Sequence, residues 1–302
     1  MAFPLRSLLT GLAMVAFAGN SLLCRLALQR LGMDPATFTL IRLLSGSLML
    51  ALLAGRLGFR PSSDAPRTGS WAAALALFTY AICFSAGYVS TPAASGALLL
   101  FGAVQISLIG HGLWQGERLS CRQVAGLMAA LSGLMALLRP GVAAPPATGA
   151  LLMLTAGMAW AAYTVIGRSV SAPVAATGAN FLRAAPMGLL AVLLLPHGAS
   201  GGSEAIGIAI FSGAVTSALG YALWYHLLPQ LAAIEAASVQ LSVPVVTAVG
   251  ASCWLGERLS FPSVIAGAVA LGGIGLIVSA PGRPRLPGGT PTVFFSIKGD
   301  QP

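Results

Sequence analysis

Gly110–Ser120 reads GHGLWQGERLS, and Gly250–Ser260 reads GASCWLGERLS. Seven of the eleven positions are identical, and the offset between the two segments is 140 residues. The match continues beyond the GERLS turns, where Val124 corresponds to Val264. The chain therefore contains an internal repeat, and repeats of this kind set the architecture of the whole fold.

A weaker similarity links the beginnings of the two copies. Four residues of the first copy align with four of the second at similar offsets: Phe17, Asn20, Arg25 and Arg42 with Trp160, Tyr163, Arg168 and Arg183. The repeat predicts two units, at 1–140 and 141–280, followed by a tail at 281–302.

The composition identifies the medium in which these units fold. Of the 302 residues, 57% are hydrophobic and 8% are charged, whereas a soluble domain carries about 25% charged residues. The mean hydropathy is +0.87. A water-soluble globule and a disordered chain are both excluded, and a polytopic membrane protein is indicated.

Uncharged runs of about 20 residues predict ten transmembrane helices. The expected spans are 7–28, 36–55, 70–89, 93–113, 121–138, 148–167, 174–195, 205–226, 232–254 and 263–280. Breaks are expected at Ser90-Thr91-Pro92, at Pro145-Pro146 and at Pro173, because proline begins a helix well and interrupts one badly. The fold class is therefore an all-α integral membrane protein.

Each half holds five predicted spans, and five is an odd number, so the second half is expected to be inverted in the membrane. Inverted repeats are typical of transporters, in which the substrate site lies between the repeats near the midplane. The first span also imitates a secretory signal peptide that ends at Ala16-Phe17-Ala18, but the repeat requires this segment as a helix.

The basic residues predict the orientation. With a cytoplasmic N-terminus, the cytoplasmic segments hold ten Lys and Arg residues and the outer segments hold four. This bias favours an orientation in the cell inner membrane in which both termini lie in the cytoplasm. The Gly- and Pro-rich tail from Pro281 is expected to be disordered and cytoplasmic.

Several other function classes lack their sequence signals. The net charge of +9 comes from single cations between apolar runs, not from a basic stripe that would bind nucleic acid. The four cysteines have no CxxC spacing, and no paired carboxylates, His/Cys cluster or GxSxG motif is present. We expect no enzyme activity, no cofactor and no metal site.

Ten spans, two five-helix halves and helices that end in GERLS resemble the EamA family of the drug/metabolite transporter superfamily. The most family-like stretch is Glu235-Ala-Ala-Ser238 with Pro244 and Gly256-Glu257-Arg258, and the similarity covers residues 7–280. Val104 stands where the first half would match Pro244, so the two halves need not bend alike. Within the family, the chain most resembles the aromatic amino acid exporters.

Aromatic and amide side chains near mid-span are the candidate substrate-binding residues. Tyr80, Phe84 and Tyr88 follow the i, i+4, i+8 spacing of one helix face. The family resemblance implies that the first, third, fourth, sixth, eighth and ninth helices line a central cavity. The full set is Asn20, Tyr80, Phe84, Tyr88, Phe101, Gln105, Trp160, Tyr163, Tyr221, Trp224 and Gln240.

Charged residues within the spans allow other interpretations. Arg42 and Arg183 occupy matching helices and either contact a substrate carboxylate or bond to neighbouring helix ends. Glu235 is the one embedded carboxylate, in the first turn of its span, so export is expected to be facilitated or weakly coupled. Glu117 and Glu257 are expected to be structural residues, in solvated turns or paired with an adjacent arginine.

Small residues at four-residue spacing predict close helix packing. They are Ala125, Ala129 and Gly133 in the fifth span, and Ala268 and Gly272 in the tenth.

The leading hypothesis is an exporter of small amphipathic metabolites, with aromatic and other apolar amino acids as substrates and alternating access as the mechanism. The expected partners are the solute and the lipid bilayer. A drug or nucleotide-sugar carrier of the same superfamily and an intramembrane enzyme are the alternatives.

Overall fold

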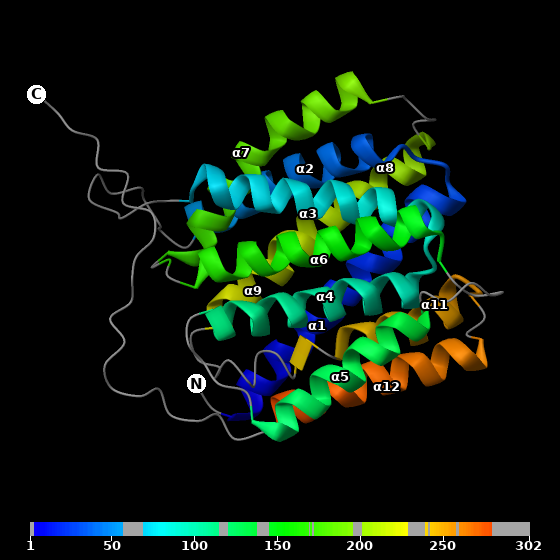
Figure 1. Ribbon diagram of the computed structural model, residues 1–302. Coiled ribbons are helices and arrows are strands. Elements are labelled where there is room, and N and C mark those ends of the chain that lie inside the picture. Colours follow the sequence, from blue (N-terminus) through cyan, green and yellow to red (C-terminus); the bar gives the residue numbers. More distant parts are fainter. Residues whose placement is uncertain are drawn as a thin grey trace, which may run out of the picture.

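The computed structural model describes residues 3–56, 69–114, 120–137, 145–168, 170, 172–195, 201–228, 239–240, 242–257 and 260–279. All regular secondary structure in these residues is helical (Figure 1). The first half contains α1 (Phe3–Arg25), continued by the π-helical η1 (Leu26–Arg30), then α2 (Pro35–Arg56), α3 (Trp71–Ser90), α4 (Ala93–Trp114) and α5 (Cys121–Leu137). The second half contains α6 (Ala147–Gly167), α7 (Pro173–Leu194), α8 (Gly202–Phe211) with η2 (Ser212–Leu219) and α9 (Gly220–Leu227), then α11 (Ser242–Trp254) and α12 (Phe261–Val278).

These segments correspond to the ten predicted spans. α3 ends and α4 begins around Thr91-Pro92, α6 begins directly after Pro146, and α7 begins at Pro173. The first expected span is part of the helical bundle, with η1 extending it to Arg30. The part of the predicted ninth span before Val239, which includes Glu235, lies outside the described residues. The tail from Ala280 also lies outside them.

Seven of the described helical segments are long and apolar enough to cross a membrane, and α11 and the Val264–Ile277 part of α12 are shorter apolar helices. Large apolar side chains cover the outer surface of the bundle, among them Leu48, Leu52 and Leu193. Exposed tryptophans stand at helix ends, at Trp71, Trp114 and Trp254, as in the aromatic belts at membrane interfaces. The exterior is therefore suited to lipid, and the polar groups are inside.

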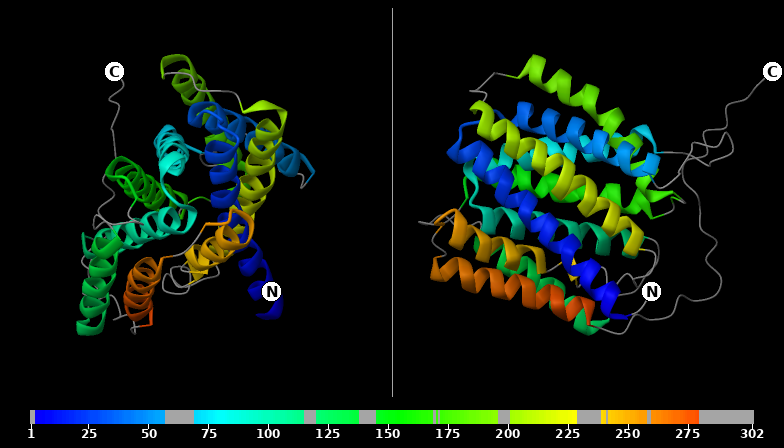
Figure 2. Two further views of the ribbon diagram at one scale, coloured as in Figure 1. Left: turned by 90° about the vertical axis from the view of Figure 1, so that its right-hand side faces the viewer. Right: turned by 180° about the vertical axis from the view of Figure 1, so that it is seen from behind.

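Helices from the two halves pack against each other throughout. α2 lies along α7, α3 along α6, α5 along α12, and α4 against α11, while α1 lies against the continuous α8–η2–α9 helix. In Figures 1 and 2, α5 and α12 form one edge of the molecule and α7 forms the opposite edge, and the view from behind in Figure 2 shows α1 running diagonally between the α8–η2–α9 helix and α11. The core is therefore shared between the halves.

The contact between α5 and α12 uses small residues, and of the predicted set Gly133 is part of it, whereas Gly272 is not. Gly126 and Gly133 face the backbone of α12 so closely that an added Cβ would collide with Gly273 and Ala270. Ala125 is exposed and Ala129 is only partly buried, whereas Gly126, Ala130 and Gly133 are buried. Small residues on this face let the backbones of the two helices approach each other closely.

A second close approach positions the polar interior. At Gly213 in η2, an added Cβ would collide with Ser45 Oγ and with the backbone oxygen of Arg42 on α2. The glycine therefore brings η2 against α2. π-helical turns within long helices occur frequently at functional sites, and here η2 carries three hydroxyl residues, Ser212, Thr216 and Ser217, which are all buried.

Candidate substrate cavity

A small cavity lies at the centre of the bundle, between the two halves. Its lining comes from α1, α3 and α4 of the first half and from α6 and α9 of the second: Phe17, Asn20, Ser21, Tyr80, Phe84, Leu100, Phe101, Trp160 and Tyr221. The free space is close to the minimum that holds a water molecule, so the lining side chains nearly fill the centre of the bundle.

The structure brings six of the candidate residues together in this lining: Asn20, Tyr80, Phe84, Phe101, Trp160 and Tyr221. Sequence reasoning missed Phe17, Ser21 and Leu100. Phe17 had a usable signal, because the internal repeat aligns it with Trp160. Ser21 and Leu100 had none, because their place on the wall depends on how the helices are rotated.

Trp160 is the centre of the aromatic wall. Its ring centroid lies 4.8 Å from that of Tyr221, 5.0 Å from that of Tyr80 and 5.8 Å from that of Phe17. These separations and the tilted or edge-on angles are those of favourable aromatic pairs. The indole Nε1 is buried and has no hydrogen-bond partner among the described residues, so the wall carries a free donor.

The other five candidates are buried but do not line the cavity. Tyr88 packs edge-on against Phe84, and Trp224 packs against Phe17. Tyr163 contacts the Trp160 ring, while its hydroxyl accepts a 3.4 Å hydrogen bond from Asn180. The remaining two are the amides Gln105 and Gln240.

A hydrogen-bonded network lies beside the cavity. Asn20 Oδ1 accepts a 2.6 Å hydrogen bond from Ser212 Oγ in η2. Its Nδ2 donates to the hydroxyl of Tyr80 over 3.5 Å. The network thus connects α1, α3 and η2, and it fixes the orientation of a polar group on an otherwise aromatic wall.

Arg42 is the charged side chain at the centre of this network, and it is 1% exposed. Its Nε donates to Ser217 Oγ at 2.8 Å, and its Nη2 donates to the hydroxyls of Tyr80 at 3.2 Å and Tyr221 at 3.0 Å. The guanidinium carbon also lies 5.3 Å from the centroid of the Tyr80 ring and 5.2 Å from that of Phe84. Arg183, its counterpart in the repeat, is only partly buried, so the two arginines are not equivalent.

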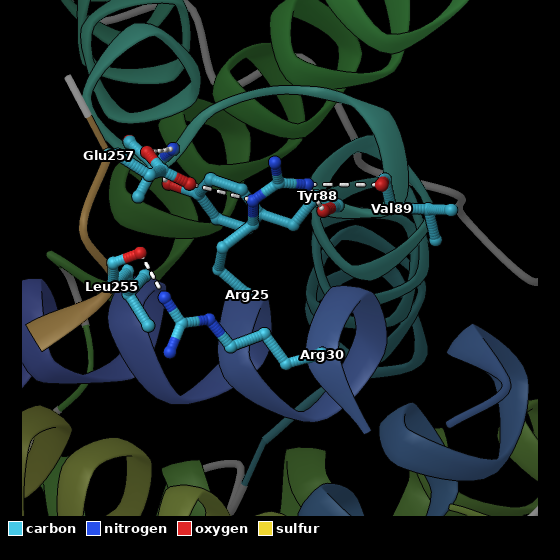
Figure 3. Close-up of polar contacts among 7 residues, drawn as sticks. Arg25, Arg30, Tyr88, Val89, Leu255 and Glu257 are labelled. Atoms are coloured by element: carbon cyan, nitrogen blue, oxygen red, sulfur yellow. Dashed lines mark hydrogen bonds and ion pairs between the residues drawn. The ribbon is translucent and has the colours of Figure 1, made fainter. Parts of the chain in front are cut away.

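A second polar cluster closes one end of the bundle (Figure 3). Arg25, at the end of α1, forms a 2.9 Å ion pair with Glu257, which follows α11. Arg25 Nη1 also donates to the carbonyl oxygens of Tyr88 and Val89 at the end of α3. Glu257 Oε2 accepts from the backbone N–H of Ala93, at the start of α4, over 2.8 Å.

This cluster corrects one expectation from the sequence. Glu257 was expected in a solvated turn or paired with an adjacent arginine, but its partner is Arg25, which is 232 residues away in the chain. Arg30, one turn beyond Arg25, donates to the carbonyl oxygen of Leu255 in the same region. The end of the bundle is therefore held by contacts between the two halves. We call these contacts, made by Arg25, Arg30 and Glu257, the ion-paired end.

A multi-pass helical bundle with a small aromatic cavity between two halves is typical of a membrane transporter and not of an enzyme. The model of the EamA-like transporter family matches residues 6–139 and again residues 147–279. The chain therefore belongs to the EamA-like transporter family, and it is a membrane transporter and not an enzyme.

Individual relatives agree with this family. An uncharacterized protein of Pseudomonas aeruginosa is 50% identical over 92% of this chain and 95% of its own length. A "probable terminal-alkyne amino-acid exporter" of Streptantibioticus cattleyicolor is 29% identical, over 84% of this chain and 92% of its own. A crystal structure with 17% identity covers 91% of this chain and 98% of its own, at a TM-score of 0.67, and supports the fold.

Proposed function

We propose that the protein exports small amphipathic metabolites, namely amino acids with aromatic or other apolar side chains, through the central cavity. The observation that carries this proposal is the cavity lining, in which aromatic rings surround a few polar groups of fixed orientation. Such a lining suits a solute with one apolar part and one polar part. The name of the Streptantibioticus relative as an amino-acid exporter points in the same direction.

Alternating access is the proposed mechanism, with the second half inverted relative to the first. The pairing of α2 with α7 and of α5 with α12 supports a two-fold relation between the halves, because such an axis can place equivalent helices beside each other. The ion-paired end joins α1, α3 and α4 to the segment after α11, so its contacts must break before this end can open. The Lys and Arg bias supports cytoplasmic termini, which would place the ion-paired end on the outer side.

The proposed export is facilitated, or is only weakly coupled to a proton gradient. Among the described residues, the carboxylates Asp34, Glu204 and Glu257 all lie at helix ends, and none lies mid-span. Asp34, for example, accepts a hydrogen bond from the backbone N–H of Thr37 in the first turn of α2. A carrier driven by protons through a buried carboxylate usually has such a group within the membrane.

Efflux from proteoliposomes tests this function. The vesicles would contain the purified full-length protein and a mixed pool of amino acids, with protein-free vesicles as the control. We expect selective, protein-dependent loss of phenylalanine, tryptophan, tyrosine and large aliphatic amino acids. Loss of none of them would contradict the amino-acid assignment, and drugs and nucleotide sugars would then be loaded into the same vesicles. Uphill accumulation driven by a pH gradient alone would contradict weak coupling.

A further inference from the structure

Arg42 has a structural peculiarity that the packing of the bundle does not explain. Its side chain is almost completely buried, and burying an unpaired guanidinium costs several kcal/mol. All three of its side-chain hydrogen-bond acceptors are neutral hydroxyls, on Ser217, Tyr80 and Tyr221. No carboxylate among the described residues pairs with it.

One end of the guanidinium has no hydrogen-bond partner in the part of the chain that the structure describes. Nη1 is buried and forms no hydrogen bond with any described residue. Arginine carries five N–H donors in a planar fork, and a buried donor without an acceptor is unfavourable by about 1–3 kcal/mol. The protein therefore maintains a positive charge with unused donors in its interior.

The acceptors of Arg42 connect this charge to the cavity. Tyr80 and Tyr221 both line the cavity, and both of their hydroxyls accept from the same Nη2. A hydrogen bond between these two phenols would use only one of their two protons, so at least one O–H is left to donate to a ligand. Donation from a cation makes a phenol a stronger donor in turn.

We propose that Arg42, Tyr80 and Tyr221 form a subsite for a carboxylate of the transported solute. The ligand supplies the negative charge that the surrounding side chains do not, and the two phenols lie between it and Arg42. The aromatic wall around Trp160 takes the apolar part of the same molecule. This inference rests on the proposed function, because it assigns one end of the proposed substrate to a definite group of residues.

Matched small molecules test the subsite directly. The full-length protein in detergent would be titrated with 3-phenylpropionate and with 3-phenylpropan-1-ol, which have the same ring and chain but differ in the carboxylate. L-phenylalanine and phenethylamine provide a second pair. We expect the carboxylates to raise the melting temperature at concentrations at least about tenfold lower than their partners.

Variants at the subsite should remove this preference. Arg42→Gln should weaken carboxylate binding by about tenfold to a hundredfold, while Arg42→Lys should retain part of it, because lysine keeps the charge but lacks the fork. Arg122→Gln is the matched control, because Arg122 is exposed on α5, where it contacts Ser279. If Arg42→Gln fails to fold, the double variant Tyr80→Phe/Tyr221→Phe keeps both rings and should lose the same preference.

Each outcome decides between the subsite and a structural role. A wild-type protein without carboxylate preference, or a preference that survives in Arg42→Gln or in the double phenylalanine variant, would overturn the subsite. A carboxylate preference that Arg42→Gln removes, together with no efflux of any amino acid, would leave the subsite standing and overturn the proposed function. A preference lost with Arg42 and accompanied by amino-acid efflux would support both.

Discussion

Two arginines of the first half face the second half in different ways. Arg25, at the end of α1, contacts a carboxylate of the protein itself, and its side chain and that of Glu257 are only 12% and 17% exposed. Arg42, on α2, is more deeply buried, and its side-chain contacts with the described residues are to neutral hydroxyls and aromatic rings. Arg25, at the end of the bundle, therefore has a counter-ion within the protein. Arg42, at its centre, has none among the described residues.

The difference separates a contact that holds the protein together from one that is available to a ligand. Arg25 has its charge neutralised by Glu257, which in turn accepts from the N–H of Ala93, so this cluster is complete within the chain. A complete cluster gains little from an additional anion, whereas an unpaired buried cation gains a great deal. The comparison predicts that an added negative charge stabilises the region around Arg42 but not the cluster around Arg25.

The largest effect is expected when Arg42 is given an anion of its own. Ser217→Asp places a carboxylate beside Nε, which is now 2.8 Å from the hydroxyl. The new ion pair should compete with the carboxylate of the solute and reduce its transport by about a hundredfold, while the melting temperature is maintained or raised. Proteoliposome efflux and thermal unfolding of the same preparations measure both. Ser217→Asn is the uncharged control, and equal transport by the two variants would contradict the idea.

The next effect concerns the apolar part of the cavity. Trp160→Ala removes the ring that contacts Phe17, Tyr80 and Tyr221, and we expect transport to fall by about tenfold to a hundredfold with normal membrane insertion. Trp114→Ala is the control, because Trp114 is 80% exposed at the end of α4. Unchanged efflux after Trp160→Ala, measured at equal reconstitution, would remove this ring from the site.

The sequence predicts the helices of this protein far better than their rotation. Apolar runs and prolines located nearly all described helix ends to within a few residues, because length and hydrophobicity are properties of each segment alone. The side of each helix that faces inward depends on its neighbours. For this reason the sequence predicts Tyr88 and Trp224 in the cavity lining, whereas in the structure they pack against Phe84 and Phe17.

The two arginine clusters illustrate the same limit. The repeat located Arg25 and Arg42, but no local pattern could connect Arg25 with Glu257 across 232 residues. The π-helical η2, which presents Ser212 and Ser217 to the network, also gave no sequence signal. Such contacts follow from tertiary packing, which a hydropathy profile does not contain.

A smaller effect is expected at the ion-paired end. Arg25→Gln and Glu257→Gln should each destabilise the fold, and the double variant should cost less than their sum, with a coupling free energy of about 1–2 kcal/mol. The pair is partly buried, so its coupling should exceed that of exposed pairs. Denaturant unfolding of the four proteins in mixed micelles gives the cycle. Strictly additive changes would mean that the ion pair contributes nothing to closing this end.

The smallest effect is expected at Tyr163, where a substitution tests whether the binding region extends beyond the residues that line the cavity. Tyr163→Phe keeps the ring that packs on Trp160 and removes the hydroxyl that accepts from Asn180. The loss of one hydrogen bond should lower stability by about 1 kcal/mol and change transport by less than about threefold. A much larger loss of transport, at unchanged stability, would mean that the Tyr163 hydroxyl contacts the solute in another conformation. The binding region would then extend along α6 beyond Trp160, and the neutral hydroxyls around Arg42 would be only one part of it.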